Sequence, residues 1–163
     1  STVQPEENPL TCSAEDISKK YYDDSPVRTG ILKSLISNSD PSFSIYDEKK
    51  QLEGFAGSVE RDTDNGQGVL AIGPVLSDKP ETTGKLLDRF ILKSDKDLLC
   101  FVFKQSTGES EKQAAQRMAS LDECSSRGFV QIDELPLMSL GGKPIDHYQD
   151  ARIVSPISLA LAS

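Results

Sequence analysis

The chain has 163 residues, of which 18 are basic and 26 acidic, giving a formal net charge of −8. This charge disfavours nucleic acid and anionic membrane surfaces as partners, and no apolar run approaches the roughly 18 residues that a membrane span requires. Three widely spaced cysteines and a single histidine indicate neither a disulfide framework nor a zinc site, so we expect a reduced, cytoplasmic protein without a metal.

The length suits a single domain, because such a chain can bury a substantial core and this one has no internal repeat or Gly/Ser linker. Residues 1–10 contain two prolines and two consecutive glutamates, a composition typical of a loose terminal segment. We therefore expect a flexible N-terminal arm over residues 1–10 and one domain over residues 11–163.

Two helices are expected at the start of the domain. Ser13 begins a capping pattern, which predicts a short helix that ends near Tyr22. Ser25 then precedes Pro26, and proline is favoured at the first position of a helix. The apolar spacing that follows predicts a second helix that ends at Asn38.

A hairpin and a third strand come next. Alternation over residues 42–46 predicts a half-buried strand, and a charged turn leads to a second strand over residues 52–60. Gly54 and Gly57 lie inside that second strand, where glycine usually marks a bulge or a close backbone approach. Residues 69–76 are mostly apolar, which is typical of a strand covered on both faces.

This third strand runs directly into an amphipathic helix over residues 81–94. Asp78, with Glu81 three residues later, is typical of a capping box at the helix start. The first turn of a helix carries free N–H groups and partial positive charge, so anionic ligands are commonly held there. The strand-to-helix junction is therefore the first candidate site.

Residues 98–103 form an uninterrupted apolar run, which predicts a strand buried on both faces and parallel to residues 69–76. We expect the two strands to diverge at their carboxyl ends, because Pro74 lacks the N–H that a regular ladder would use. A helix over residues 109–127 should follow, closed by Gly128. Its inward face is expected to comprise Ala114, Ala115, Met118, Leu121 and Cys124.

Two final strands are expected within residues 129–140 and 152–161. The apolar residues 157–161 form either a paired strand or an exposed edge, and an exposed edge invites a second copy of the chain. We therefore expect a homodimer. The complete order of helices and strands is ααβββαβαββ.

This order, with the junction in its place, resembles the GNAT superfamily of acyl-CoA N-acyltransferases. It is closest to the degenerate C-terminal acetyltransferase domain of certain two-domain acetyltransferases. The resemblance implies an α+β fold: a mixed, mostly antiparallel sheet with a splayed central parallel pair and helices on both faces. The segments that carry it are Tyr22-Asp23 with Arg28, Leu52-Glu53-Gly54-Phe55, Ile72 to Asp78, Gly128-Phe129, Leu137 to Gly141 and Arg152 to Leu161.

In this family the strand before the central helix binds the pantetheine arm of acetyl-CoA, and the helix start holds its pyrophosphate. The resemblance therefore implies that acetyl-CoA or another acyl-CoA binds at Val75, Leu76, Ser77, Thr82, Thr83, Gly84 and Lys85. Two positions of the helix start that are usually glycine in this family are occupied by Glu81 and Thr83 in this sequence. The Glu81 carboxylate would repel a pyrophosphate, and Lys79 and Lys85 would offset this in part.

The family draws a general base from the early helices or the third strand, which points to Asp23, with its neighbour Asp24, or to Glu60. A tyrosine often protonates the departing thiolate, and Cys124 stands in its place, where a thiol fits either that role or core packing. His147 is the only histidine and is either a general base or an ordinary loop residue.

Two functions fit this sequence. The first is an acyl-CoA-dependent N-acyltransferase, in which a small-molecule or peptide amine attacks the thioester directly and a carboxylate accepts the proton. The second is a non-catalytic module that keeps the acetyltransferase fold in order to bind a partner. Fold alone does not decide between them.

Overall fold

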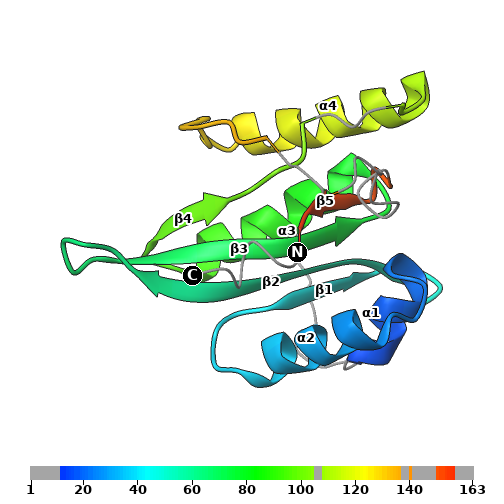
Figure 1. Cartoon of the computed structure of the whole chain (residues 1–163), viewed down its shortest axis with the longest axis horizontal. Coiled ribbons are helices and arrows are strands. Elements are labelled where there is room, and N and C mark those ends of the chain that lie inside the picture. Colours follow the sequence, from blue (N-terminus) through cyan, green and yellow to red (C-terminus); the bar gives the residue numbers. More distant parts are fainter. Residues whose placement is uncertain (1–11, 105–107, 137–139, 141–149, 157–163) are drawn as a thin grey trace.

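The computed structural model describes residues 12–104, 108–136, 140 and 150–156. Within these ranges the chain forms one mixed sheet with helices on both of its faces, as predicted (Figure 1). The elements are, in chain order, α1 (Ala14–Tyr21), α2 (Pro26–Ser37), β1 (Phe43–Tyr46), β2 (Leu52–Asp62), β3 (Gly68–Ser77), α3 (Pro80–Lys93), β4 (Asp97–Cys100), α4 (Glu111–Ser125) and β5 (Ile153–Ser155). None of the described helices is long and apolar enough to cross a membrane.

Side chains cap the first two helices where the sequence predicts it. The Ser13 hydroxyl accepts a hydrogen bond from the Asp16 amide at 3.1 Å, and the Ser25 hydroxyl accepts one from the Arg28 amide at 3.4 Å. Each bond satisfies one of the free N–H groups of the first turn. Asn38 follows the last residue of α2, so this predicted end is also confirmed.

The predicted capping box at the start of α3 is wrong. The residue that caps α3 is Lys79, and no side chain of the described residues makes a capping hydrogen bond there. The Asp78 carboxylate instead accepts hydrogen bonds from Lys20 and Tyr21 of α1. A bond from a charged lysine is stronger than one from a neutral backbone amide, which accounts for this choice of partner.

The parallel central pair is confirmed. Val69–Ile72 of β3 pair in parallel with Asp97–Cys100 of β4, and the ladder ends there, just before Gly73-Pro74. On its other edge β3 pairs antiparallel with β2 along its full length, with a register shift at Gly57. The divergence of β3 and β4 therefore begins at the predicted proline.

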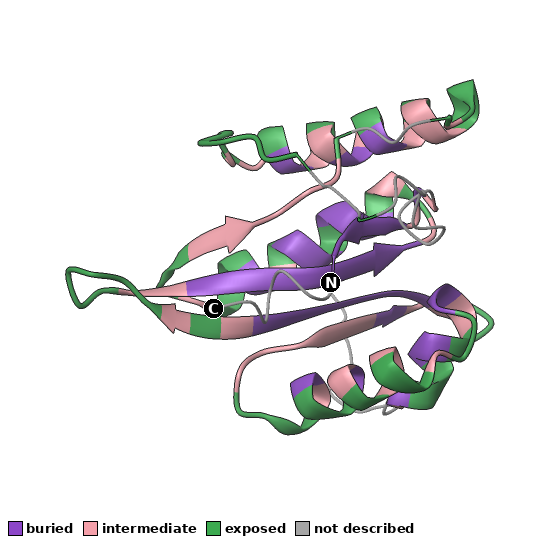
Figure 2. Ribbon diagram, in the orientation of Figure 1, coloured by how far each residue is buried: buried purple, intermediate pink, exposed green. Residues whose placement is uncertain are grey.

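The sheet separates two apolar cores, one beneath α1 and α2 and one beneath α3. Neighbouring strand residues point to opposite faces, so Leu76 lies in the first core and Val75 in the second. In β2, Phe55 likewise lies in the first core and Ala56 in the second. The resulting burial is concentrated in the central strands and the inner sides of the helices (Figure 2).

The predicted inward face of α4 is only partly correct. Cys124 is buried as predicted, but Met118 is 53% exposed and the other buried residues of α4 are Arg117 and Ser120. The side of α4 that faces the protein is therefore the one that carries Arg117 and Ser120, and not the predicted apolar stripe. The ion pair that Arg117 makes with Glu109 on the inner side explains this orientation.

Three predicted strands differ in the structure. Residues 129–136 form no strand, and the alternating Val130 and Ile132 are 78% and 80% exposed. Of residues 152–161, Ile153–Ser155 form β5, and residues 157–161 lie outside the described residues. β4 covers Asp97–Cys100 instead of residues 98–103, and it is half-buried rather than buried on both faces, because it lies at the edge of the strand order β1-β2-β3-β4.

Candidate functional site

The candidate site lies where β3 ends and α3 begins. Val75, Leu76 and Ser77, the predicted binding residues of β3, are all buried, with at most 1% of their surface exposed. Their partners on the β2 edge are Ala56, Phe55 and Gly54, respectively. The opposite edge of β3 is the one that β4 leaves after Ile72.

β5 fills this opening. It pairs antiparallel with β3 at Val75 and Leu76, on the edge that β4 has left. The Ser77 amide donates to the Arg152 carbonyl at 2.9 Å, and the Phe103 amide, beyond the end of β4, donates to the Val154 carbonyl at 3.0 Å. The chain itself therefore occupies the space between the diverging strands.

The first turn of α3 uses its polar side chains internally. The Thr82 hydroxyl donates to Glu53 Oε2 at 3.0 Å, and the Thr83 and Ser77 hydroxyls share a hydrogen bond of 2.6 Å. Both threonines are buried. Gly84 is buried too, beneath Arg127, whose Nη2 would lie 2.6 Å from a Cβ atom placed there. Of these predicted binding residues in α3, Lys85 is the exposed one.

A polar hollow of about 440 Å³ lies beside the start of α3, toward the turn between β1 and β2. It is lined by Tyr46, Asp47, Glu48, Lys49, Glu53, Lys79 and Lys85. Lys79 Nζ lies 3.2 Å from the buried Glu53 carboxylate, and this hydrogen bond raises the pKa of the lysine. The hollow thus brings together both lysines that the sequence places near the helix start.

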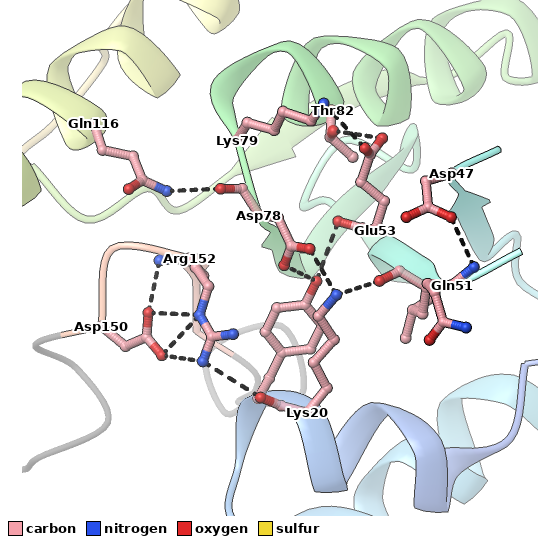
Figure 3. A network of polar contacts seen from close by, with 12 residues as sticks. Lys20, Asp47, Gln51, Glu53, Asp78, Lys79, Thr82, Gln116, Asp150 and Arg152 are labelled. Atoms are coloured by element: carbon pink, nitrogen blue, oxygen red, sulfur yellow. Dashed lines mark hydrogen bonds and ion pairs between the residues drawn. The ribbon is translucent and has the colours of Figure 1, made fainter. Parts of the chain in front are cut away.

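Asp78, between the end of β3 and the start of α3, contacts α1 and α4 (Figure 3). Its carboxylate accepts from Lys20 Nζ at 2.6 Å and from the Tyr21 hydroxyl at 2.9 Å, while its carbonyl accepts from Gln116 of α4 at 3.2 Å. Lys20 also donates to the Leu52 carbonyl. Burial, and then the negative charge of Asp78, raise the pKa of Tyr21, so this tyrosine remains a hydrogen-bond donor at neutral pH.

We expect Tyr21→Phe to lower the free energy of unfolding by about 1 to 2 kcal/mol, because it leaves the Asp78 carboxylate and the Glu53 carbonyl each short of a donor. Urea denaturation measures this loss. In an Asp78→Ala background the same substitution should cost less, since the shared contact is already absent. If Tyr21→Phe lowers the free energy of unfolding equally in both backgrounds, the hydrogen bond between Tyr21 and Asp78 does not contribute to stability.

Arg152 anchors the start of β5 to α1. Its guanidinium binds the Asp150 carboxylate at 2.8 Å, donates to the Lys20 carbonyl at 3.3 Å and lies 5.2 Å from the centre of the Tyr21 ring. Burial alone would raise the pKa of Asp150, but the hydrogen bonds and charge of Arg152 outweigh it and hold that pKa below its ordinary value. The pair is therefore fully charged at neutral pH.

The predicted catalytic residues lie apart from one another. Asp23 is exposed in the turn between α1 and α2, with a positive φ of 50°. Glu60 is exposed, pairs with Lys96 and lies opposite Leu70, about 20 Å along the strand from Leu76 at ~3.3 Å per residue. Their catalytic roles stay predictions.

Cys124 lies in the core beneath α3, and burial raises the pKa of its thiol. A thiol with a raised pKa carries little thiolate at neutral pH, and its packing is that of an ordinary core residue. Its role as an acid stays a prediction. His147, the alternative base, lies outside the described residues.

Sequence reasoning did not single out the residues that hold the junction together: Tyr21, Asp150 and Arg152. Asp150 and Arg152 stand two positions apart just before a buried apolar strand, and such a charged pair beside an apolar run is the signal that could have found them. Tyr21 carried no comparable signal, because at helical spacing it is typical of a core residue.

In this conformation the site does not fit an acyl-CoA. The backbone edge of β3 that would hold the pantetheine arm is paired with β5. The hydroxyls of Thr82 and Thr83 are engaged within the protein, and a glutamate, Glu81, is exposed in the first turn where a pyrophosphate would lie. A ligand of this kind requires at least β5 to move.

Residues 25–151 match a family model described as an acetyltransferase (GNAT) domain. Two solved structures have a similar fold, wild-type TTHA1254 from Thermus thermophilus and a point mutant of it, with TM-scores of 0.56 and 0.57. Both are 14% identical to this chain, and each alignment covers 82% of this chain. It covers 98% of the wild-type chain and 97% of the mutant chain. No curated protein matches the chain.

Proposed function

Because the chain belongs to the GNAT acetyltransferase domain family, we propose that it binds an acyl-CoA at the junction of β3 and α3 and transfers the acyl group to an amine. The observation that supports this most directly is that β3 and β4 diverge after Ile72, although β5 occupies the space between them in this conformation. The acceptor is a small molecule or a peptide that carries a primary amine.

The charges around the start of α3 support the binding of a phosphorylated ligand only in part. Lys79 and Lys85 line the hollow there, together with Lys49 of the β1–β2 turn. Glu81 opposes them from the first turn of the helix, and three carboxylates, Asp47, Glu48 and Glu53, line the same hollow. We therefore expect acyl-CoA affinity to be weak and to depend on ionic strength.

Calorimetric titration with acetyl-CoA tests the proposal, since it detects binding without knowledge of the acceptor. Binding below millimolar concentration is the expected result. If neither the natural protein nor a variant with a loosened β5 binds at millimolar concentration, the function is not acyl transfer and the non-catalytic binding module takes its place.

Replacing Glu81 with glutamine should tighten acetyl-CoA binding about tenfold. Like charges several ångströms apart at a surface cost on the order of 1 to 4 kcal/mol, and 1.4 kcal/mol corresponds to a factor of ten. Because Glu81 is exposed, the lower end of this range applies. Calorimetry at low and high salt should show that added salt helps the natural protein more than the variant.

Glu111→Gln is the matched control, since Glu111 is also an exposed glutamate in the first turn of a helix, α4. It should leave the affinity unchanged. An equal gain in both variants would mean that the net charge of the protein, and not the charge at the start of α3, limits binding.

The homodimer expected from residues 157–161 also stays a proposal.

A further inference from the structure

We infer that residues 150–156, here called the blocking segment, are an internal competitor that must leave the opening between β3 and β4 before an acyl-CoA can enter. The inference rests on the proposed function, because it concerns the same opening. It assigns to this chain a self-inhibited ground state whose release controls access to the site.

Within the described part of the chain, β3 has no free edge where a ligand would need one. On one side Val75 and Leu76 face Ala56 and Phe55 of β2. On the other side they face Ser155 and Ile153 of the blocking segment. An acyl-CoA arm that bonds to this part of β3 therefore has to replace the hydrogen bonds of the blocking segment one for one.

The blocking segment is hydrogen-bonded to both walls of the opening. The Ser77 amide of β3 and the Phe103 amide beyond β4 both donate to its carbonyl groups, those of Arg152 and Val154. Ile153 lies in the core beneath α1 and α2, and Val154 lies in the core beneath α3. The segment thus contributes side chains to the cores on both faces of the sheet.

The strand in the blocking segment is the most weakly paired strand of the described sheet. β5 has three residues, and its register with β3 shifts between its two paired positions. Its anchor, Arg152, has 37% of its side-chain surface exposed, and its carboxylate partner Asp150 has 30% exposed. Exposed ion pairs of this kind are weak, so the anchor can be released without dismantling the central strands.

The consequence is a reduced apparent affinity. A ligand that binds only the open form has an apparent dissociation constant equal to the intrinsic one divided by the open fraction. Any change that loosens the blocking segment without touching β3 or α3 should therefore tighten acyl-CoA binding.

Arg152→Ala is the variant that tests this, because it removes the guanidinium bonds to Asp150 and the Lys20 carbonyl, keeps the backbone bond from residue 152 to Asp150, and leaves β3 and α3 intact. We expect acetyl-CoA to bind about fivefold more tightly, the factor that corresponds to losing one weak ion pair and its hydrogen bond. Lys33→Ala is the control, since it also removes a cation from an exposed ion pair, with Glu15 of α1, but at a distance from β5. Its affinity should equal that of the natural protein.

Hydrogen exchange followed by mass spectrometry gives a second readout on the natural protein. Addition of acetyl-CoA should raise exchange in peptides that contain residues 150–156, and Arg152→Ala should raise it without ligand. If acetyl-CoA binds while exchange in these peptides is unchanged or reduced, the inference is overturned and the proposed function stands. If Arg152→Ala raises exchange and yet neither protein binds acetyl-CoA, the proposed function is overturned, and the inference fails with it.

Discussion

Replacing Glu109 with alanine is expected to lower the free energy of unfolding by about 3 kcal/mol or more. Glu109 Oε2 lies 2.8 Å from Nε of Arg117, whose side chain is 2% exposed, the largest fully buried side chain among the described residues. The Arg117 guanidinium also lies 5.8 Å from the centre of the Phe103 ring. Removing the carboxylate takes this counter-ion away from a buried positive charge, and this is far more costly than losing a surface ion pair.

Two controls separate this effect from a general loss of charge. Glu111→Ala removes an exposed glutamate two positions further on, and urea denaturation should show a loss well below 1 kcal/mol. The double variant Glu109→Leu with Arg117→Met should recover most of the lost stability, because apolar side chains of similar volume can replace a buried ion pair. A loss below 1 kcal/mol for Glu109→Ala itself would contradict the view that the Arg117 charge depends on this carboxylate.

Replacing Gly54 with alanine is expected to cost about 3 kcal/mol, because β2 and α3 touch at this position. A Cβ atom on Gly54 would lie 2.6 Å from Thr82 Cγ2, 3.0 Å from the Leu76 carbonyl oxygen and 3.2 Å from Leu86 Cδ1. Thr82 and Leu86 are buried, and Leu76 contributes a backbone atom, so none of them can move aside freely. The start of α3 would have to shift away from the sheet.

Gly57→Ala is the matched control in the same strand. A Cβ atom there meets no atom closer than 3.5 Å, which is ordinary van der Waals contact. The variant should be as stable as the natural protein or slightly more stable, since alanine restricts the unfolded chain. Thermal unfolding of the two variants side by side measures the contrast. Similar losses in both would mean that glycine is required by the strand and not by the contact with α3.

Local patterns predicted the first two helices, the hairpin and the strand that runs into α3. Ser13, Ser25 and Pro26 act on the turn that they begin, so their effect does not depend on distant parts of the chain. The divergence at Pro74 was predictable for the same reason: the proline has no N–H to contribute to a ladder.

The remaining features depend on partners far away in the sequence. The inner face of α4 follows the ion pair of Arg117 and Glu109, whereas the apolar pattern pointed to Met118. Asp78 reads locally as a cap, but α1 supplies it with stronger donors. The junction of β3 and α3 follows from the local pattern, while the strand that pairs with the open edge of β3 does not, because no local signal tells which open edge a three-residue strand will join.

The position of β5 has a consequence for the order in which this protein folds. Val75 and Ser155 pair although they are about 80 residues apart, so their contact closes a long loop at a high cost in chain entropy. Contacts of this separation form late. During synthesis, the hairpins and α3 can assemble on the ribosome, but Ile153 and Val154 complete both cores only after nearly the whole described chain has emerged. Nascent chains should therefore pass through a partly folded species in which the opening between β3 and β4 is still vacant.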